Sequence, residues 1–252
     1  YGGGIGSCLA TVTMIDCAVQ SNQVVQTAWD QNVLGGGIGI REGRWQTSGS
    51  VISFNVANGI LRSFNYGGGM YVDGGIHRFN NLLICRNSCT KVGGGQPIAR
   101  YAGDGAYVFN TTNVVFQNCT FVNNTNQGLR SASNIVANSC ILWGNGDDVT
   151  GDVSLAWCDV EDGDTGTNCI SEDPLFVNPA TFDFHLKSRA GHWTPGGWVL
   201  DVLTSPCIDT GDKRVNASLE PEPNRDRVNM GAYGGTYQAS LSTLEPTLLL
   251  IQ

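Results

Sequence analysis

The sequence has little charge and no helical pattern. Charged residues make up 14% of the 252 residues, while 34 residues are glycine, which opposes helix wherever it occurs. No stretch in the first 175 residues repeats its apolar side chains with the period of an amphipathic helix. The sequence therefore excludes a helical repeat protein.

Several functional motifs are also missing. None of the nine cysteines forms a CxxC pair, which disfavours a zinc knuckle and a thioredoxin-like centre. The three histidines, His77, His185 and His192, lie too far apart in the sequence to suggest a metal site. The apolar run Leu248–Ile251 is too short to span a bilayer, so we expect no transmembrane segment. A net charge of −8 argues against binding to nucleic acid or to an anionic membrane.

A repeat takes the place of these motifs. A glycine triplet and an asparagine recur together, each with successive spacings of 33 and 32 residues. The triplets begin at Gly2, Gly35 and Gly67, and the asparagines are Asn22, Asn55 and Asn87. Three residues before each asparagine stands an apolar residue, in a series that continues at spacings of 37 and 21: Val19, Ile52, Ile84, Phe121 (with Asn124) and Leu142 (with Asn145). Landmarks that move together at this period indicate a solenoid.

The content of each repeat indicates strands. Residues 11–19, 113–121 and 134–142 alternate, are rich in β-branched residues, and are broken by Asn, Gly or Ser. We therefore predict an all-β fold, a right-handed parallel β-helix whose asparagines form ladders and whose glycine triplets form tight corners. The predicted coils are 2–34, 35–66, 67–102, 103–127 and 128–151.

Four motifs near the C-terminus follow one another in a recognisable order: Asp173–Val177, Phe184–Ser188, Ser205–Asp212 (SPCIDTGD) and Asn229–Gly235 (NMGAYGG). This series resembles the terminal module that closes many secreted bacterial β-helix proteins of the pectate-lyase-like superfamily. The resemblance implies the fold and an extracellular or cell-surface location. It implies no particular reaction, because that superfamily includes lyases, hydrolases, epimerases and adhesins.

We expect one solenoid without a linker. Residues 1–172 form the coils, and residues 173–252 form a capping module continuous with the same core. The chain begins at Tyr1 inside a repeat, so we expect further coils upstream. Cys17, Cys119 and Cys140 stand in predicted strands and are expected to fill the core, whereas Cys158 and Cys169 bracket an acidic loop and are either a disulfide or free thiols.

The charges are segregated along the chain. Residues 41–100 hold seven cations against two acids, a net charge of +5, which leaves −13 on the rest. Three interpretations remain open: a groove for an acidic polysaccharide, head-to-tail self-association into filaments, or charges scattered over different faces. The expected ligand-binding residues are Arg41, Arg44, Arg62, Arg78, Arg86, Lys91 and Arg100, with Trp45 and Tyr71 as sugar-stacking rings.

Candidate chemistry is sparse. A lyase needs a base, for which Arg78, Arg100, Lys91 and His77 are the candidates. A hydrolase needs carboxylates that face one groove, and the first four coils hold few. No cofactor is required, but calcium has a candidate loop of oxygen ligands in Asp159, Glu161, Asp162 and Asp164. We therefore expect an extracellular structural or adhesive protein; the alternative is a polysaccharide lyase or glycoside hydrolase that acts on anionic glycans.

Overall fold

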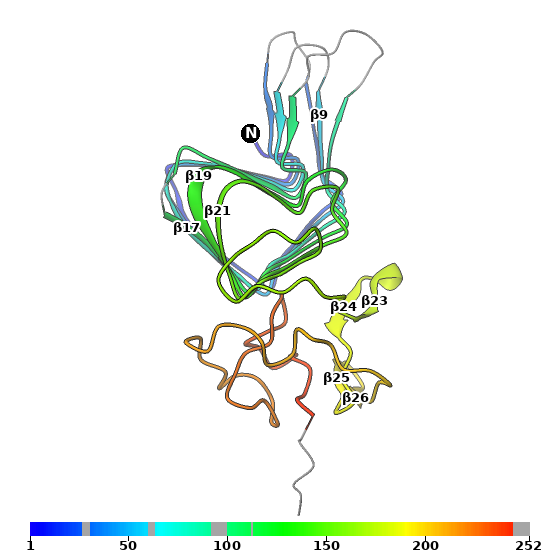
Figure 1. The fold of residues 1–252 in the computed structure, drawn as a ribbon. Coiled ribbons are helices and arrows are strands. Elements are labelled where there is room, and N and C mark those ends of the chain that lie inside the picture. Colours follow the sequence, from blue (N-terminus) through cyan, green and yellow to red (C-terminus); the bar gives the residue numbers. More distant parts are fainter. Residues whose placement is uncertain (27–30, 60–63, 92–99, 112, 244–252) are drawn as a thin grey trace, which may run out of the picture.

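The computed structural model describes residues 1–26, 31–59, 64–91, 100–111 and 113–243. Parallel strands from successive coils stack in register, which confirms the predicted parallel β-helix. Figure 1 looks down this stack, with a group of strands projecting from one corner and a separate C-terminal unit below. Among the described residues, no helix is long and apolar enough to cross a membrane.

The broadest surface, here called the long wall, is a ten-stranded sheet. In the first four coils a short turn joins the two strands that each coil contributes, whereas in later coils one long strand spans both positions. The strands are β1 (Ile5–Cys8), β2 (Thr11–Ile15), β6 (Ile38–Arg41), β7 (Arg44–Ser48), β11 (Met70–Asp73), β12 (Ile76–Asn80), β16 (Ala106–Phe109), β17 (Asn113–Gln117), β19 (Leu129–Asn138) and β21 (Val149–Ala156).

A six-stranded sheet forms the short wall, and two three-stranded sheets form the projecting arm. The short wall consists of β3 (Ala18–Gln20), β8 (Val51–Ser53), β13 (Leu83–Cys85), β18 (Thr120–Val122), β20 (Ile141–Trp143) and β22 (Asp159–Val160). The arm consists of β4 (Gln23–Val25), β9 (Val56–Gly59) and β14 (Ser88–Lys91), with β5 (Val33–Leu34), β10 (Phe64–Tyr66) and β15 (Arg100–Ala102).

The arm explains the uneven repeat spacing. The first three coils each make the excursion into the arm, and the third excursion, between β14 and β15, is the longest. The step from Asn87 to Asn124 spans that excursion and is therefore 37 residues long. The fourth coil turns from β18 directly into β19, so the next step, to Asn145, needs only 21 residues.

The predicted apolar series and asparagine ladder are both present. Val19, Ile52, Ile84, Phe121 and Leu142 are register partners along the short wall. Each ladder asparagine donates its Nδ2 to the Oδ1 of the next, at 3.0, 3.0, 3.1 and 3.0 Å along Asn22, Asn55, Asn87, Asn124 and Asn145. The ladder ends where Asn145 Nδ2 donates to Asp148 Oδ1 at 2.8 Å. Each buried amide is thus satisfied by its neighbour, which fixes the register of the coils.

The glycine triplets form corners where backbones touch. Gly35 has φ +71°, a conformation that L-residues with a side chain rarely adopt. A Cβ on Gly36 would overlap the carbonyl oxygen of Gly68 in the next coil. Glycine is required there because the chain turns in contact with its own repeat.

The C-terminal unit, here called the terminal module, lies against the outer face of the short wall (Figure 1). It contains β23 (Phe176–Asn178), a 3₁₀ turn η1 (Pro179–Thr181), β24 (Asp183–Leu186), β25 (His192–Thr194) and β26 (Gly197–Val199), followed by turns.

The sequence predicts a module continuous with the core of the coils; in the structure the module shares an apolar cluster with the outer face of the short wall. In that cluster Leu83 and Val122 of the short wall meet Phe184 and Met230 of the module. The core inside the coils is separate and holds Trp45 and the large aromatic rings. The short wall is therefore apolar on both faces, which gives the module a surface to cover.

The cysteines follow the coils. All nine are free thiols. Cys119, Cys140 and Cys158 are buried in the core, as expected for the first two, whereas Cys17 is exposed because it belongs to the edge coil. Cys169 is partly exposed, and no disulfide joins it to Cys158.

Candidate functional site

The terminal module leaves the outer face of the long wall uncovered (Figure 1). Along β7 the side chains alternate, so that Trp45 and Thr47 point inward while Arg44, Gln46 and Ser48 are exposed. The same alternation exposes Arg78 on β12, and Arg41 is exposed at the end of β6. The period of two along each strand thus places Arg44 and Arg78 on the outer face of the neighbouring strands β7 and β12, and Arg41 is exposed at the turn that leads into β7.

These three cations have no ion pair. Within the described ranges, none of them forms a salt bridge. Arg78 Nη1 donates to Asn113 Oδ1 at 2.8 Å and to the His77 carbonyl oxygen at 3.1 Å. The guanidinium of Arg78 is therefore held across two coils by neutral groups and keeps its charge available to a ligand.

Two carboxylates stand beside the arginines. Glu42 occupies the turn between β6 and β7 at φ +57°, and its backbone N–H donates to the Asp73 carbonyl oxygen at 2.7 Å. Asp73 is the register partner of Arg41. A Cβ on Gly74 would lie 2.6 Å from the Glu42 carboxyl group, so glycine there leaves room for that group. The face therefore combines three cations with two acids in two neighbouring coils.

Two predicted site residues point the other way. Trp45 is fully buried and donates its Nε1 to Ser7 Oγ at 3.1 Å. His77 is also fully buried; its Nε2 lies 2.7 Å from the Gly74 carbonyl oxygen, and burial lowers its pKa. Trp45 as a sugar-stacking ring and His77 as a base are therefore wrong, because strand alternation turns both into the core.

Tyr71 belongs to a stack at the base of the arm. Its ring lies 6.4 Å from that of Tyr66 and 5.9 Å from that of Tyr107, with interplanar angles of 9° and 7°. Its side chain is 5% exposed, and burial raises its pKa. Tyr71 supports the arm instead of offering an open ring to a sugar.

The other predicted cations do not join this face. Arg86 lies over the Phe182 ring at 4.3 Å and donates to the Pro179 carbonyl oxygen at 3.1 Å, so it fastens the terminal module. Arg62 lies outside the described residues. Lys91 and Arg100 end β14 and begin β15 of the arm, and their side chains are outside the described part of the chain.

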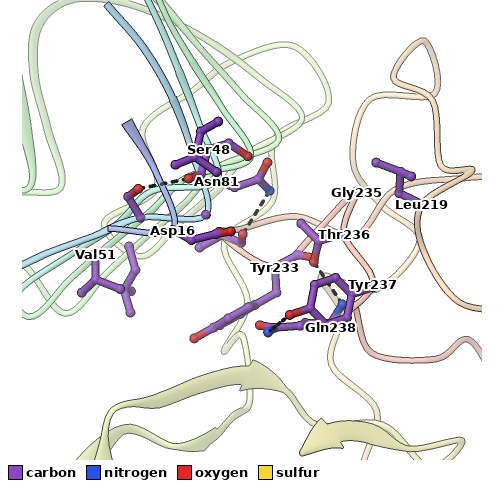
Figure 2. A pocket seen from close by; sticks show the side chains of 15 residues that line it. Asp16, Ser48, Val51, Asn81, Leu219, Tyr233, Gly235, Thr236, Tyr237 and Gln238 are labelled. Carbon is purple, nitrogen blue, oxygen red and sulfur yellow. Dashed lines mark hydrogen bonds between the residues drawn. The ribbon is translucent and has the colours of Figure 1, made fainter. Parts of the chain in front are cut away.

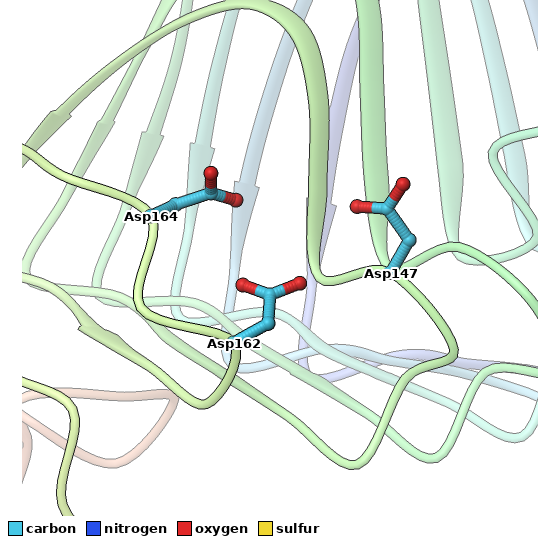
Figure 3. Close-up of side chains that lie close together, drawn as sticks. All are labelled: Asp147, Asp162 and Asp164. Atoms are coloured by element: carbon cyan, nitrogen blue, oxygen red, sulfur yellow. The ribbon is translucent and has the colours of Figure 1, made fainter.

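The acidic loop forms a cluster different from the predicted one. Carboxylate oxygens of Asp147, Asp162 and Asp164 lie within 4.8 Å of one another (Figure 3). Burial, together with the neighbouring carboxylates of Asp162 and Asp147, raises the pKa of Asp164. Three carboxylates are suitable calcium ligands, with the remaining positions left to other oxygens. Sequence reasoning missed Asp147 because it comes from the preceding coil, and only solenoid stacking brings it close.

The other two predicted calcium ligands have structural partners. Asp159 is buried, accepts a hydrogen bond from the Glu172 N–H at 3.0 Å and lies 3.0 Å from Cys207 Sγ. Burial raises the pKa of Asp159 to about 6. Glu161 accepts a hydrogen bond from the Gly144 N–H at 2.6 Å. Both carboxylates therefore close the end of the solenoid and are absent from the cluster.

A cleft lies between the first three coils and the terminal module (Figure 2). Its volume is about 380 Å³, and it is lined by ends of long-wall strands on one side and by residues 235–238 on the other. Sequence periodicity gives no sign of it, because it exists only where the module docks beside the coils.

These features define a class of protein: a parallel β-helix with an uncovered polar wall and a module docked on its side. Residues 53–211 match the sequence profile of the disaggregatase-related family, and the chain belongs to that family. No curated protein and no solved structure matches the chain.

Proposed function

We propose that this protein binds an acidic polysaccharide along its long wall, as an extracellular or cell-surface β-helix protein. The observation that carries the proposal is the exposure of Arg44 and Arg78 on the outer face of neighbouring strands, with Arg41 exposed at the adjoining turn; none of the three forms an ion pair among the described residues. A guanidinium binds carboxylate or sulfate groups through two parallel hydrogen bonds, which suits uronates and sulfated sugars.

The shape of the wall also favours a linear ligand. Neighbouring strands lie about 4.8 Å apart, and the rows of outward side chains run straight across the coils. The row through Gln46, Arg78 and Val115 continues to Val136 and Ser154. A chain of sugars laid along this row would meet polar side chains at Gln46, Arg78 and Ser154 and apolar ones at Val115 and Val136.

Head-to-tail self-association has less support. The arginines lie on the side of the solenoid, and residues 1–25 of the first coil contain no lysine or arginine. Head-to-tail stacking would leave Arg44 and Arg78 unpaired, because they lie on the side wall and not on a surface where one coil stacks on the next. For this reason we favour a polysaccharide as the partner of the basic face.

The test is binding of immobilised uronate-containing and sulfated polysaccharides, measured at low and high salt. We expect the double variant Arg44→Gln, Arg78→Gln to lose at least about tenfold in affinity, and wild-type binding to weaken as salt screens the charges. Lys213→Gln removes an exposed charge from the terminal module and is the matched control. Equal binding by the wild type and the double variant would overturn the proposal.

A catalytic alternative rests on Glu42 and Asp73, which adjoin the same arginines. Two carboxylates beside a bound glycan are the groups that a glycoside hydrolase uses, and a lyase would use Arg78 as base. The family's description, disaggregatase related, has the suffix of an enzyme name and is a second reason to test for catalysis. Incubation with the bound polysaccharide should then release reducing ends or unsaturated products, and Asp73→Asn should abolish that release while binding persists.

A further inference from the structure

The cleft beside the terminal module is continuous with the basic face. Strand β7 carries Arg44 at its start and Ser48 at its end, and Ser48 lines the cleft. Four residues of extended strand separate the two positions by about 13 Å. A ligand held at the arginines can therefore reach the cleft along one strand.

The lining of the cleft differs chemically from the basic face. It includes no lysine or arginine and a single carboxylate, that of Asp16. Asp16 is exposed at the corner after β2, and within the described ranges no side chain or N–H bonds to its carboxylate. The hydroxyl groups of Ser50 and Thr236 and the amide of Gln238 add neutral polar groups to a lining that also has an apolar part, formed by Ile15, Val51, Leu83, Leu219 and Ala232.

An aromatic ring forms the opposite rim. Tyr237 is 67% exposed, and Gln238 Nε2 lies 3.0 Å from its hydroxyl oxygen (Figure 2). The ring of Trp193 meets it edge-on, with centroids 6.1 Å apart at 86°. These contacts hold the phenol in place while most of the ring stays open to a ligand.

We propose that this cleft binds a neutral sugar residue of the polysaccharide that lies on the long wall. Asp16 accepts hydrogen bonds from the sugar hydroxyls, and the sugar's apolar face packs on the Tyr237 ring. An acidic sugar is disfavoured, because its carboxylate would face that of Asp16 without a cation in the lining. A volume of about 380 Å³ is within the usual range for small-molecule sites. That the sugar belongs to a polysaccharide on the long wall rests on the proposed function, whereas sugar binding in the cleft does not depend on it.

The experiment is a titration of wild-type protein with a panel of uncharged tetrasaccharides of glucose, galactose and mannose, followed by NMR or calorimetry. We expect binding of at least one tetrasaccharide, and a loss of at least about tenfold in affinity in Asp16→Asn and in Tyr237→Ala. Asp152→Asn and Trp198→Ala change an exposed acid and an exposed ring outside the cleft, and should bind as the wild type does.

Separate variants distinguish the two proposals. Arg44→Gln with Arg78→Gln should leave binding of the neutral tetrasaccharide unchanged. A wild type that binds a neutral tetrasaccharide but no acidic polysaccharide would overturn the proposed function alone. No binding of any neutral tetrasaccharide by the wild type, or binding that Tyr237→Ala leaves intact, would overturn the cleft proposal. Tyr237 is largely exposed, so this variant should fold even if Asp16→Asn does not.

Discussion

Asn87 shows how much of the coil register depends on single residues. The side chain is fully buried and bridges three coils. It donates to Asn124 Oδ1 at 3.1 Å and to the Ile52 carbonyl oxygen at 2.9 Å, and it accepts from the N–H and the Nδ2 of Asn55, both at 3.0 Å. The recurring asparagine was visible in the sequence, and the physical need to satisfy a buried amide explains why it recurs.

Replacement of Asn87 by alanine should therefore be severe. We expect Asn87→Ala to lower the free energy of unfolding by about 3 kcal/mol, because it leaves buried groups on two neighbouring coils without partners. Asn22→Ala at the edge of the ladder should cost about 1 kcal/mol, because Asn22 is less buried. Urea denaturation of both variants measures the difference, and equal losses would contradict the ladder as the source of register.

Glu220 gives the stability of the terminal module a pH dependence. Its Oε1 accepts the N–H groups of Asn229 at 2.8 Å and of Gly235 at 2.6 Å, and burial raises its pKa from 4.5 to about 7. A raised carboxyl pKa contributes stability that is complete below the unfolded value and is lost as pH rises through the folded value. The free energy of unfolding should thus fall between pH 4.5 and about 7.

The variant Glu220→Gln isolates this contribution. We expect a smaller loss of stability over the same pH range, because Gln does not ionise. Part of the fall should remain, since burial raises the pKa values of Asp148 and Asp159 to about 6. Chemical denaturation at several pH values tests this, and a variant as pH-dependent as the wild type would exclude Glu220 as a cause.

At the scale of elements, the short strands and their order were predictable, because period-two alternation and recurring landmarks are local. The arm was not predicted, since β4 and β5 flank a segment without a distinctive pattern. The inward position of Trp45 and His77 was missed for a different reason. A shift of one residue in the assumed strand register exchanges the two faces, and the sequence alone left that register open.

The stacking of coils also sorts the thiols. Cys8 and Cys17 are exposed and Cys169 is partly exposed, while the other six are buried. Burial raises the pKa of Cys85 to about 12 and those of Cys140 and Cys158 well above the ordinary value. We expect a maleimide to label three cysteines in the native protein and the rest only after denaturation, as read by mass spectrometry. Rapid native labelling of Cys140 or Cys158 would contradict the packing of the coils.

At the scale of the whole molecule, the four C-terminal motifs led us to expect a module after the coils, but they did not predict where it docks. The motifs specify turns, whereas docking depends on which residues of the short wall point outward. Asn81 Nδ2 donates to the carbonyl oxygens of Ala232 and Gly234 at 3.0 and 2.7 Å, and Asn118 Nδ2 donates to that of Asn229 at 2.8 Å. These contacts join segments more than 100 residues apart, beyond the reach of local pattern.

The shared apolar cluster should make the coils and the module unfold together. We expect calorimetry of the wild type to show one transition, and Met230→Ala, at a residue 2% exposed, to lower its temperature at a cost of about 2–5 kcal/mol. Leu203→Ala is the control, because Leu203 is 48% exposed and its removal loses little buried surface. Two separate transitions would show that the module folds independently.

The lateral position of the terminal module has an evolutionary consequence. A cap at the end of a solenoid fixes the point where the stack must stop, but a module fastened to the side contacts only the coils beneath it. Coils stacked beyond those that contact the module would extend the asparagine ladder and leave the docking surface unchanged. A protein built in this way can gain polar wall without any change in its anchor.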